Sequence, residues 1–181
     1  MEESKEKLKS VVINSNILFS SLIKEEGFTR AALLFLKENK NLRFMIPKTC
    51  LEEFKSYAGE IARKSKLTIG NVIMGFEKLT ESVERMDESG LKDEIKEGLK
   101  YVKDEKDVLF VAVALKYRPS YILTYNKKDY RIKELKQLDV WVVNPKEALD
   151  LIGMELEVET KEKTKRNLLS YITKLKMLIK K

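Results

Sequence analysis

The sequence predicts an α/β fold, a three-layer sandwich in which helices cover both faces of a central, mainly parallel β-sheet. Its predicted strands are continuous apolar runs with no alternation of polar residues, which is typical of strands buried on both faces. These runs alternate along the chain with segments that have the apolar spacing of helices. With 181 residues, 43% of them hydrophobic, the chain is long enough to bury one core.

The first part of the chain begins with a strand over residues 10–14. Helices are predicted over 16–25 and 28–39. Apolar residues at helical spacing predict the buried face of the second helix: Ala31, Leu34 and Phe35. A second strand covers 42–47 and ends on Pro47, a residue that can begin the next helix.

The middle of the chain is predicted to be helical. The helix after Pro47 carries an apolar stripe: Leu51, Phe54, Ala58 and Ile61. Thr68 is the expected N-cap of a helix that runs to about residue 84, because its hydroxyl can accept a hydrogen bond from a free backbone amide. Asp-Glu-Ser-Gly at 87–90 breaks the pattern, and one more helix ends at about residue 102.

Asp104 is the expected N-cap of the helix that follows. Asp107 stands three positions later, which makes a D-x-x-D variant of the capping box. Pro119 ends this helix, because proline cannot continue the hydrogen-bond pattern.

The last part of the predicted domain alternates between strand and helix. Strands are predicted over 120–126 and 139–144, with a short helix over 131–137 between them. A closing helix follows and ends at Gly153, which can adopt the left-handed conformation common at helix ends.

The residue types present restrict the chemistry. There is no His and a single Cys, Cys50, which excludes Ser-His-Asp and Cys-His catalysis, cysteine zinc sites and internal disulfides. Any bound metal must therefore be held by carboxylates, amides and water, which suit Mg²⁺ or Mn²⁺. The apolar run at 11–23 is too short to span a bilayer, and residues 1–10 mix both charge signs, unlike a signal peptide; we expect a cytoplasmic protein with no membrane partner. Abundant Lys and Glu with a single Gln are typical of heat-adapted, thermophile proteins.

The formal net charge of +7 belongs to the C-terminal segment. Residues 160–181 contain eight basic residues and one acidic residue, whereas residues 1–159 are neutral overall. A basic terminal segment fits an acidic partner, above all nucleic acid, although a solvated helix face explains the same pattern.

We therefore divide the chain into an α/β domain over residues 1–157 and a basic amphipathic helix over 158–181. The apolar stripe of this helix would pack on the body of the chain or on a second copy in a homodimer: Leu168, Ile172, Leu175 and Ile179. Four of its basic residues are expected to bind nucleic acid: Lys165, Arg166, Lys174 and Lys176.

Polar side chains gather where the predicted strands end. Asn14, Ser15 and Asn16 follow the first strand, while Thr124 and Asn126 end a later one. Ligands of open parallel sheets bind beyond the carboxyl ends of the strands, so we expect these side chains to lie together. Two acidic residues near the starts of helices can reach the same edge: Glu53 and Asp107.

Four stretches, in this order, resemble the motifs of the PIN-domain family. VVINSNILFSSLI resembles its opening strand, which is usually followed by Asp-Thr-Asn, and IPKTCLEEF resembles its second motif, with Glu53 as the acidic residue. DEKDVLFVAVAL resembles the third, with Asp107 as the site residue and Asp104 as a frequent companion. YILTYNKKDY resembles the fourth, a strand that ends in Thr-x-Asp or Thr-x-Asn. Together they cover residues 10 to about 144.

The resemblance implies a metal-dependent nuclease, most often acting on single-stranded RNA, in which clustered carboxylates hold one or two divalent ions. It implies these catalytic residues: Asn14, Glu53, Asp107 and Asp129. The implied ligands of Mg²⁺ or Mn²⁺ are the same four residues with Asp104 and Asn126. Supporting roles fall to Ser15, Asn16 and Thr124.

The sequence departs from this pattern at two acidic positions. Asn14 replaces the first Asp, and Asn126 replaces another, although Asp129 stands three residues later and can take its place. A carboxamide offers a neutral oxygen and carries an NH₂ group that repels a cation. We therefore expect weak metal binding and poor catalysis, whether Asn14 is a natural loss or an engineered change.

Simpler explanations exist for single residues. Asp104 fits a helix cap better than a metal ligand. Asp107 also fits a first-turn acid that interacts with the helix dipole, but its register with the other motifs favours a site role. Asp129 could begin a turn. Tyr125 and Tyr130 could stack on bases or pack within the domain.

Three functions follow from these observations. The first is a PIN-like endoribonuclease, with the toxin half of a toxin–antitoxin pair as one role and an antitoxin as its protein partner. The second is a non-catalytic RNA-binding or protein-interaction module with a decayed metal site. A third, binding of another phosphorylated ligand, ranks lower because the sequence contains no Gly-rich phosphate loop.

Overall fold

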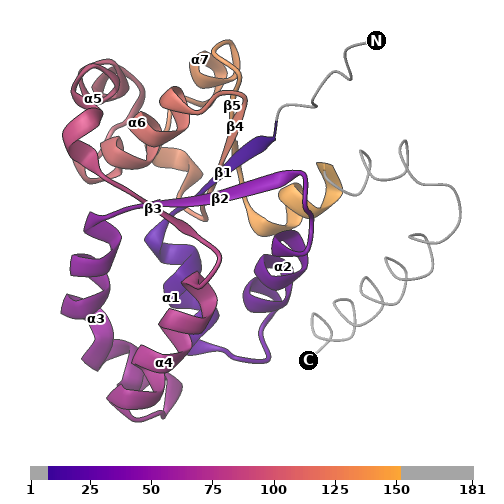
Figure 1. Ribbon diagram of the computed structural model, residues 1–181, viewed down its shortest axis with the longest axis vertical. Helices are drawn as coiled ribbons and strands as arrows, with labels where there is room; N and C mark the ends of the chain where they lie inside the picture. Colours follow the sequence, from indigo (N-terminus) through magenta and orange to yellow (C-terminus); the bar gives the residue numbers. More distant parts are fainter. Residues whose placement is uncertain (1–7, 152–181) are drawn as a thin grey trace, which may run out of the picture.

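A five-stranded parallel sheet organises the part of the chain that the computed structural model describes, residues 8–151 (Figure 1). Its strands are β1 (Lys9–Ile13), β2 (Leu42–Pro47), β3 (Glu84–Met86), β4 (Ser120–Leu123) and β5 (Val140–Val143). They lie in the order β3-β2-β1-β4-β5, and each neighbouring pair is parallel. The prediction of an α/β sandwich with a mainly parallel sheet is confirmed.

Helices form a layer on each side of the sheet (Figure 1). On one side lie α1 (Ser15–Ile23), α2 (Phe28–Lys37), α3 (Thr49–Ser65) and α4 (Ile69–Thr80). On the other lie α5 (Lys92–Gly98), α6 (Val108–Lys116) and α7 (Ile132–Lys136). Short 3₁₀-helices complete the connections: η1 (Glu88–Gly90), η2 (Leu99–Tyr101), η3 (Glu105–Asp107) and η4 (Lys127–Asp129). A final helix begins at residue 145 and continues to 151, where the described residues end.

The chain reverses its direction across the sheet between β1 and β4. It moves outward from β1 through β2 to β3, then returns to place β4 beside β1 and β5 beyond it. Right-handed crossovers put the helices of the two directions on opposite faces, which explains the two layers. The carboxyl ends of β1 and β4 therefore form a topological switch point, where open α/β sheets bind ligands.

The core is continuous across the sheet and is built from the predicted apolar runs. Ile13, Ile122 and Leu123 are completely buried in the two central strands. Helix α6 packs against β1, β2 and β4, which explains why almost all of its residues are apolar. No helix among residues 8–151 is long and apolar enough to cross a membrane.

Strand β3 was not predicted. The predicted helix capped by Thr68 ends at Thr80 instead of about residue 84, although its cap is confirmed, since the Thr68 hydroxyl accepts from the Asn71 amide at 3.2 Å. β3 is a three-residue edge strand, Glu-Arg-Met, with no apolar run. Its pairing comes from tertiary structure, including the ion pair of Arg43 with Glu84.

The buried face of α2 also differs from the prediction. Leu34 is 43% exposed, and Ala31 and Phe35 are only partly buried. The buried residues are Ala32, Leu33 and Leu36. Residues 31–36 are all apolar, so their spacing fits more than one helix face, and only packing against β2 and α1 selects between them.

The remaining predictions concern where elements and domains begin and end. Pro47 is the last residue of β2, and the helix begins two residues later at Thr49. The predicted cap Gly153, the boundary at residue 157 and the basic helix 158–181 lie outside the described residues.

Replacing Phe76 by Ala should lower the free energy of unfolding by about 3–5 kcal/mol, the usual cost of removing a buried aromatic ring. Phe76 is 1% exposed and stacks on Phe54 with ring centroids 3.9 Å apart, joining α4 to α3. Urea denaturation measures the effect. Ile73→Ala on the same helix is the control, because Ile73 is 45% exposed and its loss should cost less than about 0.5 kcal/mol. Equal losses for both variants would contradict this packing.

Candidate active site

Asn14 directly follows β1 and is the N-cap of α1. Its Oδ1 accepts a hydrogen bond from the backbone amide of Asn16 at 3.1 Å, which satisfies a free donor of the helix. The amide nitrogen is thereby turned the other way. Nδ2 donates to Asp107 Oδ1 at 2.9 Å and to the Tyr130 hydroxyl at 2.9 Å.

Asn14, Asp107 and Tyr130 form a closed and buried triangle of hydrogen bonds. The Tyr130 hydroxyl donates to the same Asp107 Oδ1, at 2.9 Å. The three residues are 5%, 8% and 4% exposed, respectively. Such a network satisfies one carboxylate oxygen with two donors and no cation.

Burial raises the pKa of the Asp107 carboxyl above its usual value. The hydrogen bonds from Tyr130 and Asn14 oppose this increase, while the nearby charges of Asp129 and Asp104 add to it. Both predicted companions of Asp107 are thus close enough to interact with it electrostatically. Burial, followed by the Asp107 charge, also raises the pKa of the Tyr130 hydroxyl, which remains a neutral donor.

The capping box predicted at 104–107 forms only in part. The Asp104 carboxylate accepts from the Lys106 amide at 3.0 Å and caps η3, as the simpler explanation of this residue proposed. The Asp107 side chain does not return to the Asp104 amide, because it is engaged by Asn14 and Tyr130. Asp107 therefore faces the site from the N-terminus of α6.

Glu53 lies in the first part of α3 and has a hydrogen-bond partner of its own. The Ser15 hydroxyl donates to Glu53 Oε2 and also contacts the buried Cys50 thiol at 3.0 Å. Burial raises the pKa of this thiol to about 12, so Cys50 is a neutral packing residue at neutral pH. Ser15, which was predicted to support the site, here positions Glu53.

Asn126 and Asp129 form a pair of their own in the loop after β4. The side-chain amide of Asn126 donates through Nδ2 to Asp129 Oδ2. The buried Thr124 hydroxyl accepts hydrogen bonds from Asn16 Nδ2 and from the backbone N–H of Asn126, both at 3.0 Å. Asn16 and Thr124 thus connect the loop after β1 to the loop after β4. Their role in supporting a site stays a prediction.

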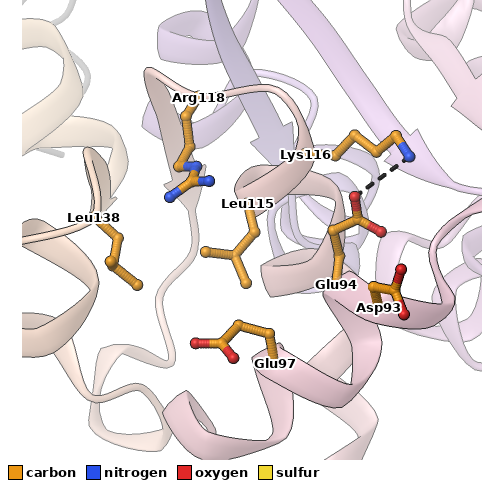
Figure 2. A pocket seen from close by; sticks show the side chains of 7 residues that line it. All are labelled: Asp93, Glu94, Glu97, Leu115, Lys116, Arg118 and Leu138. Atoms are coloured by element: carbon orange, nitrogen blue, oxygen red, sulfur yellow. Dashed lines mark ion pairs between the residues drawn. The ribbon is translucent and has the colours of Figure 1, made fainter.

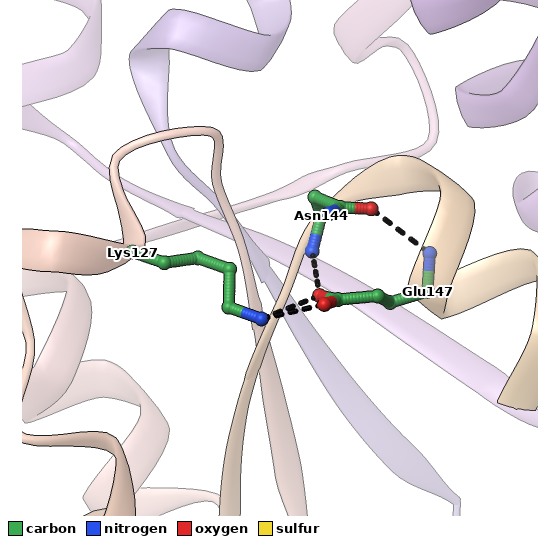
Figure 3. Close-up of polar contacts among 3 residues, drawn as sticks. All are labelled: Lys127, Asn144 and Glu147. Carbon is green, nitrogen blue, oxygen red and sulfur yellow. Dashed lines mark hydrogen bonds and ion pairs between the residues drawn. The ribbon is translucent and has the colours of Figure 1, made fainter.

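An ion pair holds η4 against the final helix (Figure 3). Lys127 Nζ lies 2.7 Å from both carboxylate oxygens of Glu147. Glu147 is itself fixed by a reciprocal cap, in which its carboxylate accepts from the Asn144 amide and its own amide donates to Asn144 Oδ1, each at 2.9 Å. This arrangement fixes the loop that carries Asp129 and Tyr130, and the sequence analysis did not identify it.

The predicted metal ligands do not form a metal site in this arrangement. Within residues 8–151 no group of three or more Asp, Glu, Cys or His side chains could hold an ion. Glu53 is bonded to Ser15 and Asp129 to Asn126, while the Asn14 NH₂ group points at Asp107. A donor directed at a carboxylate stands where a ligand oxygen would be needed, so the residues in this arrangement do not fit a divalent ion.

The predicted nucleic-acid residues of the C-terminal segment lie outside the described residues: Lys165, Arg166, Lys174 and Lys176. A cavity of about 490 Å³ lies at the opposite end of the sheet, where Arg118 precedes β4 and Leu138 precedes β5 (Figure 2). Its charges are largely paired, with Glu94 3.3 Å from Lys116 and Glu97 bonded to Lys100 and Tyr101.

A comparison with protein-family models agrees with the motifs. A family model described as PIN domain matches residues 12–168. Among solved structures, the chain is similar to the crystal structure of VapBC2 from Rickettsia felis bound to a DNA fragment from their promoter, with 14% identity and a TM-score of 0.47. This match covers 75% of the present chain and 98% of the other. No curated protein matches the sequence.

Asp107→Asn should stabilise the protein at neutral pH. Because the folded pKa of Asp107 is raised, its contribution to stability is fully present below the unfolded value and is lost as pH rises through the folded value. An Asn carbonyl would keep both hydrogen bonds without the buried charge, and a gain of about 1 kcal/mol would raise Tm by about 2–4 °C. Thermal unfolding at pH 7 and near pH 3 measures this. A variant that is less stable than wild type at pH 7 would contradict the account.

Proposed function

Because the chain belongs to the PIN-domain family, we propose that it binds single-stranded RNA at the carboxyl edge of its sheet and that its PIN-type endoribonuclease activity is impaired by Asn14. One observation carries this proposal. The amide nitrogen of Asn14, fixed by the helix cap on its other side, donates to Asp107 at 2.9 Å. An N–H donor in this position disfavours binding of a cation at the Asp107 carboxylate, the site residue of the third motif.

We infer the need for a divalent metal ion from membership of the family. PIN domains generally depend on divalent metal ions. A carboxylate introduced by Asn14→Asp would keep one oxygen for the cap and turn the other toward Asp107, which restores a paired-carboxylate site. Mg²⁺ or Mn²⁺ would then be held by that carboxylate with Asp107, Glu53 and Asp129, and Asp104 and Asn126 would be further ligands.

A second function is favoured by the completeness of the buried triangle. Asp107 already has both of its hydrogen-bond donors, Asn14 and Tyr130, and needs no ion to satisfy that oxygen. This supports a non-catalytic RNA-binding or protein-interaction module on the same fold. The two functions differ in whether the unaltered protein retains slow, metal-dependent cleavage.

The remaining parts of the proposal come from sequence and family. The basic residues of the C-terminal segment would hold the phosphate backbone: Lys165, Arg166, Lys174 and Lys176. An antitoxin as protein partner, a homodimer and a cytoplasmic setting stay predictions. So does the heat-adapted character suggested by composition.

An RNA cleavage assay with Mn²⁺ tests the role of Asn14. Asn14→Asp should cleave fluorescent single-stranded RNA at least about 100-fold faster than the unaltered protein, the size of effect that one preorganised polar group has on the rate in an active site. Asn14→Ser is the matched control, because it keeps a good N-cap but adds no charge and should stay slow. Asn14→Asp combined with Asp107→Ala should also be inactive.

Two results would contradict the proposal. Cleavage by the unaltered protein at the rate of Asn14→Asp would show that Asn14 does not impair the site. Bound but uncut RNA with every variant would support the second function and remove the catalytic one.

A further inference from the structure

Two segments that flank the buried triangle lie side by side. Val102 and Tyr130 form an isolated antiparallel bridge. On either side of it, the Lys103 amide donates to the Asp129 carbonyl at 2.7 Å and the Arg131 amide donates to the Tyr101 carbonyl at 2.8 Å. The segment that leads to Asp107 is thus joined directly to the loop that carries Asp129 and Tyr130, although about 25 residues of sequence separate them.

The two joined segments carry several exposed basic side chains. The side chains of four residues in these segments are exposed and make no hydrogen bond or ion pair within residues 8–151: Lys103, Lys106, Lys128 and Arg131. We call these four residues the basic rim. Exposed lysines without a partner among the described residues occur elsewhere too, such as Lys40 and Lys136. What distinguishes the rim is its position on the two joined segments that carry Asp107 and Asp129. Among basic residues, only those of the C-terminal segment were predicted to bind nucleic acid, and the rim was not predicted.

The basic rim can offset the repulsion between RNA phosphates and the acidic side chains at this edge of the sheet. Asp104, Asp107 and Asp129 would repel a phosphodiester that approaches without an intervening cation. Exposed ammonium and guanidinium groups on the same two segments provide the opposite charge. They bind phosphates whatever the base sequence, and no partner among residues 8–151 has to be displaced first.

An aromatic side chain lies next to the same loop. Tyr125 directly precedes Asn126, is 48% exposed, and its hydroxyl lies 2.6 Å from that of Thr29, which connects the loop to α2. Its backbone amide donates to Asn16 Oδ1 at 3.2 Å. An exposed ring on an anchored loop can stack on an unpaired base, and only single strands present their bases in this way.

We propose that the basic rim, with Tyr125 as a stacking residue, is the surface of the α/β domain that binds the phosphate backbone of single-stranded RNA. The proposal rests on the RNA-binding function proposed above and locates it. The rim binds phosphates, Tyr125 holds a base, and the strand passes the Asn14–Asp107 edge between them.

Fluorescence anisotropy of the full chain with a labelled oligouridylate, in EDTA so that no strand is cut, tests the rim. Lys106→Ala with Lys128→Ala should weaken binding about tenfold or more. It should also reduce the slope of log affinity against log salt by about 1.4, because each lost single-strand phosphate contact removes about 0.7. The control replaces two exposed lysines that make no hydrogen bond or ion pair within the described residues. These are Lys40, which lies shortly before β2, and Lys136, the last residue of α7. The variant Lys40→Ala with Lys136→Ala should bind within about twofold of wild type.

A second pair of variants separates stacking from charge. Tyr125→Ala should weaken binding several-fold at an unchanged salt slope, whereas Tyr125→Phe, which keeps the ring, should bind like wild type. If wild type binds and the rim and control variants are equal, the rim is overturned and binding belongs to the C-terminal segment, while the proposed function stands. If wild type does not bind the oligouridylate at all, the RNA-binding function fails and the rim fails with it.

Discussion

The two ends of one side-chain amide determine the character of this site. Asn14 stands where β1 becomes α1, and its oxygen is engaged by the first turn of that helix. The nitrogen must then face Asp107, because the amide is planar and one end is already fixed. An Asp in the same position would present a charged oxygen in place of that donor. With Asp at this position the site would contain two carboxylates, whereas with Asn14 the Asp107 carboxylate is satisfied by a hydrogen bond from within the protein. The difference comes from one atom, Asn14 Nδ2, whose direction is set by the helix cap.

The rest of the fold provides the setting for this interaction. The reversal of strand order brings the ends of β1 and β4 together, and the backbone N–H of Asn14 donates to the Leu123 carbonyl at 3.0 Å across that boundary. Tyr130 reaches the same point only because its loop is held from both sides. The Lys127–Glu147 ion pair fixes the loop from the final helix, and the bridge to Val102 fixes it from the segment before α6. Buried networks of this kind specify geometry when all of their members are satisfied, and no buried side-chain polar atom among the described residues lacks a partner.

The sequence predicted the parts of the fold that depend on local pattern. Long apolar runs identified β1, β2, β4 and β5, and the Thr68 cap identified the start of α4. β3 was missed because a three-residue edge strand carries almost no local signal, and the face of α2 was wrong because six consecutive apolar residues fit several faces. The site residues were found as positions at one sheet edge, but their pairings were not. Which side chain bonds to Glu53 or Asp129 depends on side-chain orientations of a few ångströms, which spacing in the sequence does not encode. Tyr130 could equally have been a packing or a stacking residue, and only the tertiary structure places its hydroxyl on Asp107.

The most direct test of the central claim is a crystal structure of the unaltered protein soaked in Mn²⁺, with anomalous scattering to locate the ion. The account predicts no anomalous peak at the Asp107 carboxylate, and Asn14 Nδ2 within hydrogen-bond distance of Asp107 Oδ1. A peak coordinated by Asp107 together with Asn14 Oδ1 would contradict it, because the amide would then have abandoned the helix cap to act as a metal ligand.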